Sequence, residues 1–169
     1  EVEILRRKVA KLTARCKYLE QKQSGNTFVK LPVELDQNTQ FSNQFTFSNG
    51  GRSIAKTQSN NVWHEVYFKQ PIPSTGKHYF SVRIDQSASM QIMIGVATGN
   101  WKNDGNSNHY NQHGSYSFYC YNGHIYERST SRVSSMPLIV GDIIVTKIDM
   151  DNLVVIWEMD GYQLGWTKI

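Results

Sequence analysis

Apolar and polar residues alternate in the middle of the chain, first over residues 79–85 and again over residues 90–96. Phe80, Val82 and Ile84 share one side of the first stretch, and the second places its apolar residues likewise, at Met90, Ile92, Ile94 and Val96. A period of two with one apolar face is typical of a half-buried antiparallel strand. Only the polar segment 86–89 separates the two stretches, so they are predicted to pair as a hairpin. Gly95 indicates a bulge or a close backbone approach.

Similar short runs recur along the chain, and turn residues separate them. Residues 28–31 form a candidate strand that Pro32 confines to a sheet edge. The other candidates are Phe41, Phe45 and Phe47, then residues 52–57, 62–68, 115–121, 124–128, 143–150 and 153–160. In the last of these, one face carries Leu153, Val155, Trp157 and Met159, which assigns Trp157 to the core. Many short strands with little helix between them predict an all-β, two-sheet antiparallel sandwich.

The first residues follow a different period, because their apolar positions recur at alternating steps of three and four. This is the heptad seam of a coiled coil, with Val2, Val9 and Cys16 at a positions and Leu5, Leu12 and Leu19 at d positions. β-branched a residues with Leu at d favour a parallel dimer. The alternative is an amphipathic helix packed on its own domain. The predicted organisation is a helix at 1–23, a linker with an edge strand at 24–39, and the β domain at 40–169.

The net charge of +4 belongs to the N-terminal segment. Residues 1–30 hold eight Lys/Arg and three Asp/Glu (+5), whereas the rest hold ten and eleven (−1). A nearly neutral β domain argues against nucleic acid as a partner, since such a domain gathers basic residues on the fold itself. No apolar run is long enough to span a membrane, so no membrane partner is expected. Two cysteines without a disulfide framework favour a cytoplasmic location, and Glu1 at the start suggests a fragment or a processed chain.

Side chains that could carry catalysis or hold a metal occur singly. His109 and His113 are four residues apart, but in a loop rich in Asn and Gly rather than on a helix, so no metal site and no cofactor are predicted. Three aspartates, Asp149, Asp151 and Asp160, flank turns, where Asp stabilises the turn itself. His64 and His78 fall within predicted strands and Trp63 and Phe118 are expected in the core. The sequence therefore predicts no enzyme.

The sixteen residues 99–114 contain five asparagines and three glycines. A connection of this length inside a compact domain is either disordered or functional. Trp101 stands in it without alternating apolar neighbours, and Tyr110 follows in the same loop. Exposed aromatic residues of this kind dominate the energetics of interfaces. The alternative is that Trp101 folds back over a sheet edge.

Six short motifs, in order, resemble those of the SPRY domain, a bent β-sandwich that serves as a protein-interaction module. They are FSNGGR at 47–52, PSTGKHYFSV at 73–82, IGVAT at 94–98, SYSF at 115–118, GDII at 141–144 and DGYQLG at 160–165. Phe80 stands where the family commonly has Trp, and family members usually continue through a further strand beyond Ile169. A coiled coil before such a domain resembles the tripartite-motif ubiquitin ligases, but the chain has no RING or B-box cysteines.

The resemblance implies a non-enzymatic module that binds a protein or peptide through loops at one rim of the sandwich, at residues 57–61, 99–114 and 128–136. The SPRY branch fused to SOCS boxes has a similar GVAT strand and a loop Tyr, and binds short peptides there, which implies roles for Thr98 and Tyr110. Composition and position add further candidates, which are Trp101, Asn103, Asn106 and Arg128. Dimerisation through the heptad seam would add avidity.

Two other functions remain open at this stage. A carbohydrate-binding sandwich also uses Asn, His, Trp and Arg, although the galectin-like HxNPR and WxxExR strands are absent from the chain. In a structural scaffold, the coiled coil would carry assembly and the β domain would decorate a polymer. A glycan array compared with a peptide library separates the first from the protein-binding module, and the sequence upstream of Glu1 separates the second.

Overall fold

The computed structural model describes residues 6–9, 12–13, 27–38, 41–57, 63–98, 114–127 and 130–169. Their fold is mostly β, with one 3-10 turn η1 at Ser42–Gln44. The strands are β1 (Val29–Lys30), β2 (Phe45–Ser48), β3 (Ser53–Lys56), β4 (Lys77–Arg83), β5 (Met93–Ala97), β6 (Ser115–Tyr119), β7 (His124–Glu127), β8 (Thr130–Val133), β9 (Ile143–Asp149), β10 (Val154–Met159) and β11 (Tyr162–Lys168).

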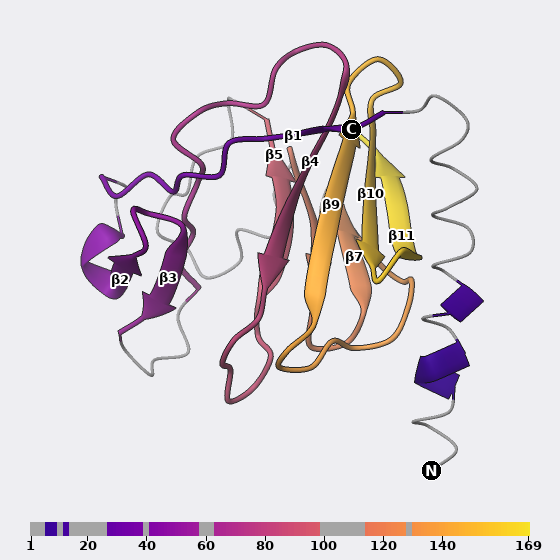
Figure 1. The fold of residues 1–169 in the computed structure, drawn as a ribbon, viewed down its shortest axis with the longest axis horizontal. Helices are drawn as coiled ribbons and strands as arrows, with labels where there is room; N and C mark the ends of the chain where they lie inside the picture. The colour runs from indigo at the N-terminus through magenta and orange to yellow at the C-terminus, as the bar shows by residue number, and fades with distance from the viewer. Residues whose placement is uncertain are drawn as a thin grey trace.

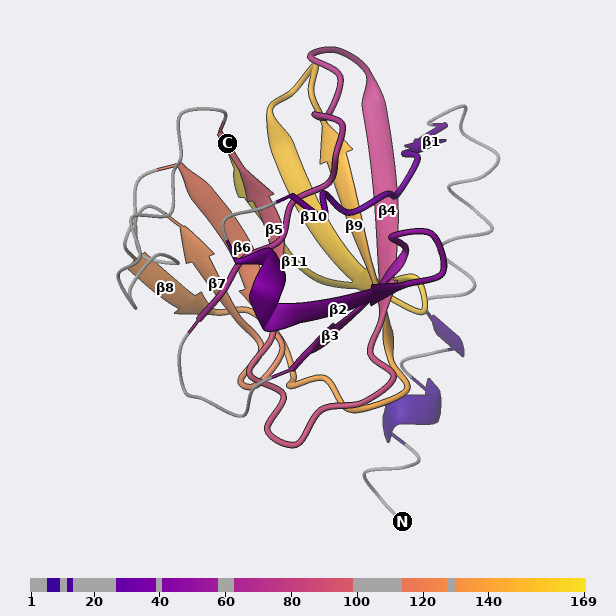
Figure 2. The ribbon, with the colours of Figure 1, turned by 90° about the vertical axis from the view of Figure 1, so that its left-hand side faces the viewer.

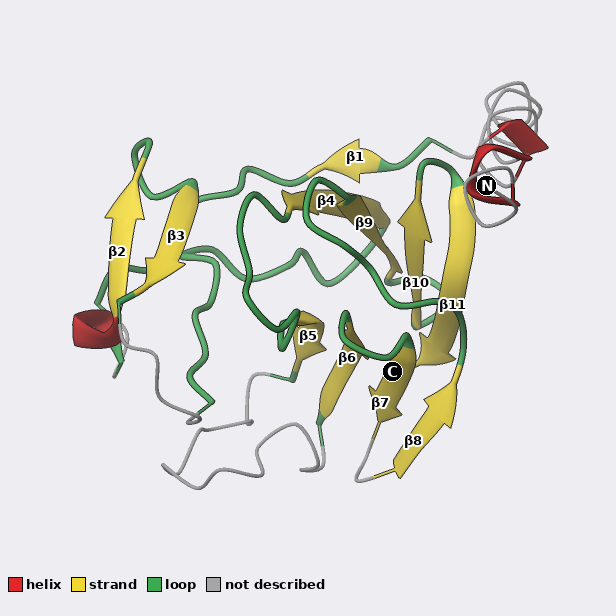
Figure 3. Ribbon diagram, turned by 90° about the horizontal axis from the view of Figure 1, so that it is seen from below, coloured by secondary structure: helices red, strands yellow, loops and turns green. Residues whose placement is uncertain are grey.

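Two sheets form the layers of a sandwich, as Figure 3 shows by their two rows of strands. One layer has the order β1-β4-β9-β10-β11 and the other the order β5-β6-β7-β8, while β2 and β3 pair separately. Pairing within the layers is antiparallel except for β1, which runs parallel to β4. This arrangement is consistent with the predicted all-β sandwich.

The core lies between the two layers, where alternating residues of both sheets point inward. Trp157 and Phe118 are its largest fully buried side chains, one from each layer. The Trp157 indole N–H donates to the Ile94 carbonyl at 3.0 Å, so a single side chain also links β10 to β5 across the sandwich. The predicted inward faces of residues 80–84 and 155–159 are confirmed by the burial of Phe80, Ile84, Val155, Trp157 and Met159.

The predicted hairpin between residues 79–85 and 90–96 is wrong, because β4 and β5 lie in different sheets. β4 pairs with β9 and β5 pairs with β6, and Figure 2 shows the connector passing from one layer to the other. Alternation fixes which side chains face the core, but it does not identify the neighbouring strand, since strands of opposite layers also turn apolar faces toward each other. Met90 and Ile92 belong to the connector, where they pack partly buried against the core.

The other strand predictions are right where a strand pairs with its neighbour in the sequence, and several of the rest are wrong. The runs 115–121 and 124–128, and likewise 143–150 and 153–160, were expected to form hairpins across their short turns, and the pairs β6–β7 and β9–β10 confirm this. The runs on either side of the turn at Asn49-Gly50-Gly51 also pair, as β2 and β3. Residues 63–67 form no strand, and Phe68 makes only an isolated bridge with Leu35. Leu153 has a positive φ of 54° in the turn before β10 and is 49% exposed, so it leaves the buried face assigned to it. β8 lies inside a segment that was predicted to be a loop.

β1 covers an edge of the five-stranded sheet, as Pro32 predicts. The Leu31 amide donates to the Tyr79 carbonyl at 2.8 Å, which continues the pairing of β1 with β4. Phe28 lies against two lysines of the outer face, with the Lys147 and Lys77 ammonium nitrogens 5.4 Å and 6.0 Å from its ring centroid. Cation–π contact with a partly buried lysine stabilises the position of the segment before β1.

Apart from η1, helical structure in the described part of the chain is limited to residues 6–9 and 12–13, on the β11 side of the molecule (Figure 1). Val9 and Leu12, which the heptad pattern places at a and d, are 59% and 66% exposed. The other seam residues lie outside the described residues, namely Val2, Leu5, Cys16 and Leu19. No coiled coil is evident in what is described, so it stays a prediction. None of the described helical residues forms a helix long and apolar enough to cross a membrane.

Candidate functional site

One rim of the four-stranded sheet collects the strand ends that border the predicted binding loops. The Thr98 amide donates to the Gly114 carbonyl at 2.8 Å, which closes the two ends of the 99–113 loop. Glu127 pairs with Thr130, which closes the next connection. Since Ala97 pairs with Ser115 and Tyr116 with Glu127, all these ends lie at the same rim.

Of the predicted partner-binding residues, the structure describes only Thr98, which is exposed. Its hydroxyl lies so close to Gly114 that a Cβ there would stand 2.5 Å from Thr98 Oγ1, and Gly114 has a φ of +98°. A glycine is therefore required where the loop rejoins β6. The remaining candidates lie outside the described residues: Trp101, Asn103, Asn106, Tyr110 and Arg128.

A cleft opens beside this rim, between β7 and β8 on one side and β11 on the other. Its volume is about 630 Å³, and its lining residues are Tyr116, Glu127, Thr130, Arg132, Trp166, Thr167 and Lys168. The cleft lies at the side of the sandwich where the edge strands β8 and β11 of the two layers run past each other. It adds charged and hydroxyl-bearing side chains to the rim.

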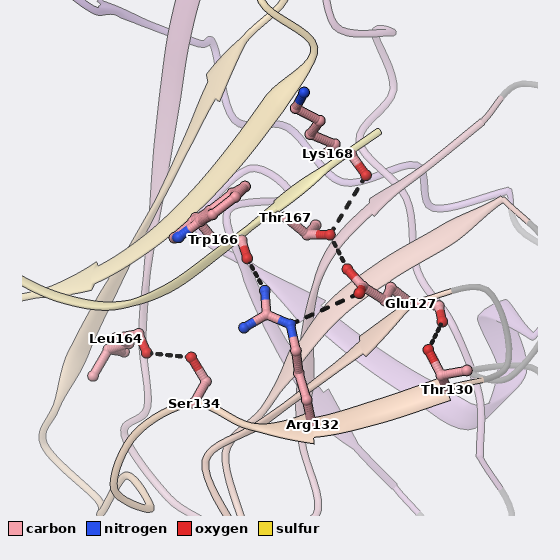
Figure 4. Close-up of polar contacts among 8 residues, drawn as sticks. All are labelled: Glu127, Thr130, Arg132, Ser134, Leu164, Trp166, Thr167 and Lys168. Carbon is pink, nitrogen blue, oxygen red and sulfur yellow. Dashed lines mark hydrogen bonds and ion pairs between the residues drawn. The ribbon is translucent and has the colours of Figure 1, made fainter.

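A charged pair points toward the sheet interior at this cleft. Arg132 is paired with the fully buried Ile125, and Glu127 with the buried Tyr116, so both occupy core-facing positions of their strands. Arg132 Nε lies 3.7 Å from Glu127 Oε1, and Figure 4 shows both side chains directed toward β11. Burying such a pair is costly unless each charge is compensated.

Groups of β11 provide part of that compensation. The Thr167 hydroxyl donates to Glu127 Oε2, and Arg132 Nη2 donates to the Trp166 carbonyl. Nearby, the Ser134 hydroxyl donates to the Leu164 carbonyl at 2.6 Å. These bonds tie the edges of the two sheets together. The Arg132 and Glu127 side chains remain 44% and 29% exposed, so the ion pair by itself contributes about 0–1 kcal/mol to stability.

The strand arrangement around this rim fits one known family. A scan of protein families matches the SPRY domain to residues 77–167, more than half of the 169-residue chain. The chain belongs to the SPRY family. No curated protein sequence matches the chain significantly. SPRY domains are generally protein-interaction modules and typically non-catalytic.

Four of the motifs that resemble the SPRY family lie wholly inside the matched segment, and two of them reach the rim. IGVAT is β5 with Thr98 at its end, SYSF begins β6 at the same rim, GDII leads into β9, and DGYQLG is the β10–β11 turn. The segment 73–82, which continues into β4, begins just before the match, and the 47–52 segment is the β2–β3 turn outside it.

Sequence reasoning missed the cleft residues of the SPRY domain because three of them act across sheets. Glu127 and Arg132 lie on neighbouring strands of one sheet, and Thr167 of the other sheet reaches them only after the layers stack. Arg132 also lies in a segment that was predicted to be a loop, so its pairing with Ile125 and its core-facing position could not be inferred from the sequence.

Reactive side chains elsewhere in the SPRY domain are inert or structural. Burial raises the pKa of the Cys120 thiol to about 12, which keeps it protonated at neutral pH. Asp149 accepts hydrogen bonds from Asn152 and stabilises the β9–β10 turn, as predicted. Burial raises the pKa of Asp149, but its bonds with Asn152 and Lys77 outweigh burial, so the net pKa is lowered. Among the described residues, no group of His, Cys, Asp and Glu could hold a metal ion.

The predicted packing residues behave differently from one another. Phe118 is fully buried, as expected, whereas Trp63 is half-buried with its ring edge-on to Tyr119 at 5.7 Å. His78 lies in β4 and its Nε2 hydrogen bonds with the Thr75 carbonyl at 2.7 Å. His64 lies outside any strand, and its ring centroid is 4.9 Å from that of Phe41. Burial, together with the nearby Lys56, lowers the pKa of His64.

Proposed function

We propose that this SPRY domain binds a protein or peptide at the rim formed by the ends of β5, β6, β7 and β8. The observation that carries the proposal is the convergence of strand ends on one side. Thr98 and Gly114 close the long polar loop there, and Glu127 and Thr130 close the next connection beside an open cleft. Binding residues commonly sit on loops that a rigid scaffold positions.

The first test concerns the aromatic residues of the long loop. The double variant Trp101→Ala/Tyr110→Ala is expected to weaken binding of the natural partner by about 2 kcal/mol or more, because aromatic anchors dominate interface energy. Partners captured by the wild-type chain can be identified by mass spectrometry and titrated against both proteins by calorimetry. Unfolding by heat should be unchanged.

A matched control for this test is Tyr121→Ala. Tyr121 is 56% exposed and lies in the turn after β6, at the opposite end of the same sheet. Its removal is expected to leave the affinity within about twofold of the wild type, since exposed side chains outside an interface contribute little. If the double variant also binds with wild-type affinity, the rim is not the binding site.

We further propose that the chain is presented as a parallel dimer through its N-terminal heptads. The support is the seam of Val2, Leu5, Val9, Leu12, Cys16 and Leu19 in the sequence, together with the exposure of Val9 and Leu12 in the single chain. Apolar residues that repeat at a and d positions stabilise a helix mainly when a partner helix covers them. A dimer would raise the apparent affinity for paired epitopes.

The dimer proposal predicts that Leu12→Glu converts the full chain to a monomer, because a charge at a d position faces the partner helix. Sedimentation equilibrium measures this directly. Ala10→Glu is the control: it adds the same charge at a b position, outside the seam, and should remain dimeric. Mild oxidation should also cross-link wild-type dimers through Cys16 but not the Cys16→Ser variant, since the chain's other cysteine, Cys120, is fully buried. A wild-type chain that is monomeric at high concentration contradicts the proposal.

A further inference from the structure

We propose that the cleft between β8 and β11 receives an acidic side chain of the bound peptide, with its carboxylate held by Arg132. This inference rests on the proposed function of the rim and names the chemistry of its ligand. The cleft, the position of Arg132 in it and the charges around it carry the argument.

Arg132 is a charged residue at a core-facing position of the edge strand β8. Its strand register directs it toward the interior of the sandwich, next to positions that hold Ile125 and Tyr116. Charged residues at core-facing positions destabilise a fold unless they have a function or a full set of partners. The cleft of about 630 Å³ leaves the side chain 44% exposed, so that position is open to a ligand.

The guanidinium is only partly occupied by its neighbours. A guanidinium has five N–H donors. Among the described residues, one hydrogen bond from Arg132 is present, to the Trp166 carbonyl, and Nε faces Glu127 at 3.7 Å, longer than a hydrogen bond. The remaining N–H groups can donate to a second carboxylate in the bidentate geometry that arginine favours.

Another ion pair of the same domain shows what a closed pair looks like. Lys147 Nζ lies 2.6 Å from Glu158 Oε2 on the outer face of the five-stranded sheet, and the two side chains are 14% and 12% exposed. Arg132 and Glu127 are farther apart and two to three times as exposed. The closed pair is complete without a ligand, whereas the open pair leaves an arginine facing the cleft.

The local charge favours an anion. The charged residues that line the cleft are Arg132, Lys168 and Glu127, which gives a net charge of +1, and Arg132 is the cation directed toward Glu127, whereas the Lys168 side chain extends away from it (Figure 4). Glu127 is also engaged by the Thr167 hydroxyl, which reduces its ability to compete for the guanidinium. The hydroxyls of Thr130 and Thr167 lie at the same opening and donate to Glu127, so their oxygens can accept a hydrogen bond from a peptide N–H group.

The test selects binders from a displayed library of random dodecapeptides on the immobilised full chain, in the wild type and in the Arg132→Gln and Arg83→Gln variants. Arg83 is the matched control, because it is also paired with a carboxylate, Asp85, but stands 65% exposed at the far end of β4. Thermal unfolding of each variant establishes that the fold is intact. Arg132→Lys, which keeps the charge and loses the planar fork, serves as a second variant.

We expect peptides selected on the wild type and on Arg83→Gln to be enriched in Asp and Glu, and those selected on Arg132→Gln to lack that enrichment. Replacing the selected Glu by Gln should weaken binding to the wild type about tenfold or more, as for a lost charged hydrogen bond. The same replacement should have less than a twofold effect on Arg132→Gln, and the affinity of the acidic peptide should fall with added salt.

The outcomes separate this inference from the proposed function. Peptides that bind the wild type without acidic enrichment, or that bind Arg132→Gln equally well, overturn the inference and leave the peptide-binding rim in place. If no peptide is selected by the wild-type chain, peptide binding itself is wrong, and the inference falls with it. Loss of acidic peptides on Arg83→Gln as well as on Arg132→Gln would also contradict a specific role for the cleft.

Discussion

Replacing Trp157 with alanine is expected to lower the free energy of unfolding by about 3–5 kcal/mol. Trp157 is fully buried at the centre of β10, and its indole N–H donates to the Ile94 carbonyl of the opposite sheet at 3.0 Å. The substitution therefore opens a cavity in the core and removes a hydrogen bond that joins the two layers. Urea denaturation followed by far-UV circular dichroism measures the loss.

Trp166→Ala is the control for this prediction. It removes the same side chain from a position that is 48% exposed, on a neighbouring strand of the same sheet. We expect it to cost less than about 1 kcal/mol, since partly exposed side chains contribute little to stability. Equal losses in the two variants would mean that Trp157 does not fill the core as described.

Gly95→Ala is expected to destabilise the domain by about 3 kcal/mol through overpacking. A Cβ at Gly95 would stand 1.9 Å from the Tyr116 carbonyl oxygen and 2.7 Å from the Ser117 Cα. Both atoms belong to the backbone of β6, so no side chain can rotate away and the two strands must separate. The close backbone approach that the sequence indicates at Gly95 is therefore confirmed, and its effect is measurable by the same denaturation experiment.

Gly50→Ala provides the comparison for a glycine with open space around it. Gly50 has a φ of +64° and no atom within 4 Å of an added Cβ, so only the strain of the left-handed backbone applies. That strain amounts to about 1 kcal/mol. A Gly95→Ala variant as stable as Gly50→Ala would show that β5 and β6 do not approach as closely as the structure places them. Because Gly95 lies two residues before the rim, its substitution should also disturb partner binding.

Much of the fold could be predicted because it depends on local sequence. The turns Asn49-Gly50-Gly51 and Asn122-Gly123 join strands that pair as hairpins, since such residues adopt the backbone angles that tight turns require. The alternation that ends at Trp157 and Met159 correctly placed both in the core. Both kinds of signal come from residues that are close together in the chain, so they can be recognised without the tertiary structure.

Predictions failed where the partner strand lies far along the chain. Residues 80–84 and 92–96 have the faces expected of a hairpin, but β4 pairs with β9 and β5 with β6. Residues 63–67 have strand-like composition but form no strand, although the Asp36 amide donates to the Tyr67 carbonyl and Phe68 bridges Leu35. β8 carries few apolar residues, and its pairing with β7 makes it a strand. A segment becomes a strand when another strand hydrogen bonds to it, and amino-acid composition does not identify that other strand.

The sequence by itself determined the all-β class, the core-facing residues of the main strands, the SPRY motifs and Thr98 as a rim residue. The tertiary structure decided the assignment of β4 and β5 to opposite layers and the cleft that Glu127, Arg132 and Thr167 share. Periodicity is a property of one strand and can be seen in its residues. A site made by three strands of two sheets depends on how the layers stack, which is fixed by packing between residues distant in the chain.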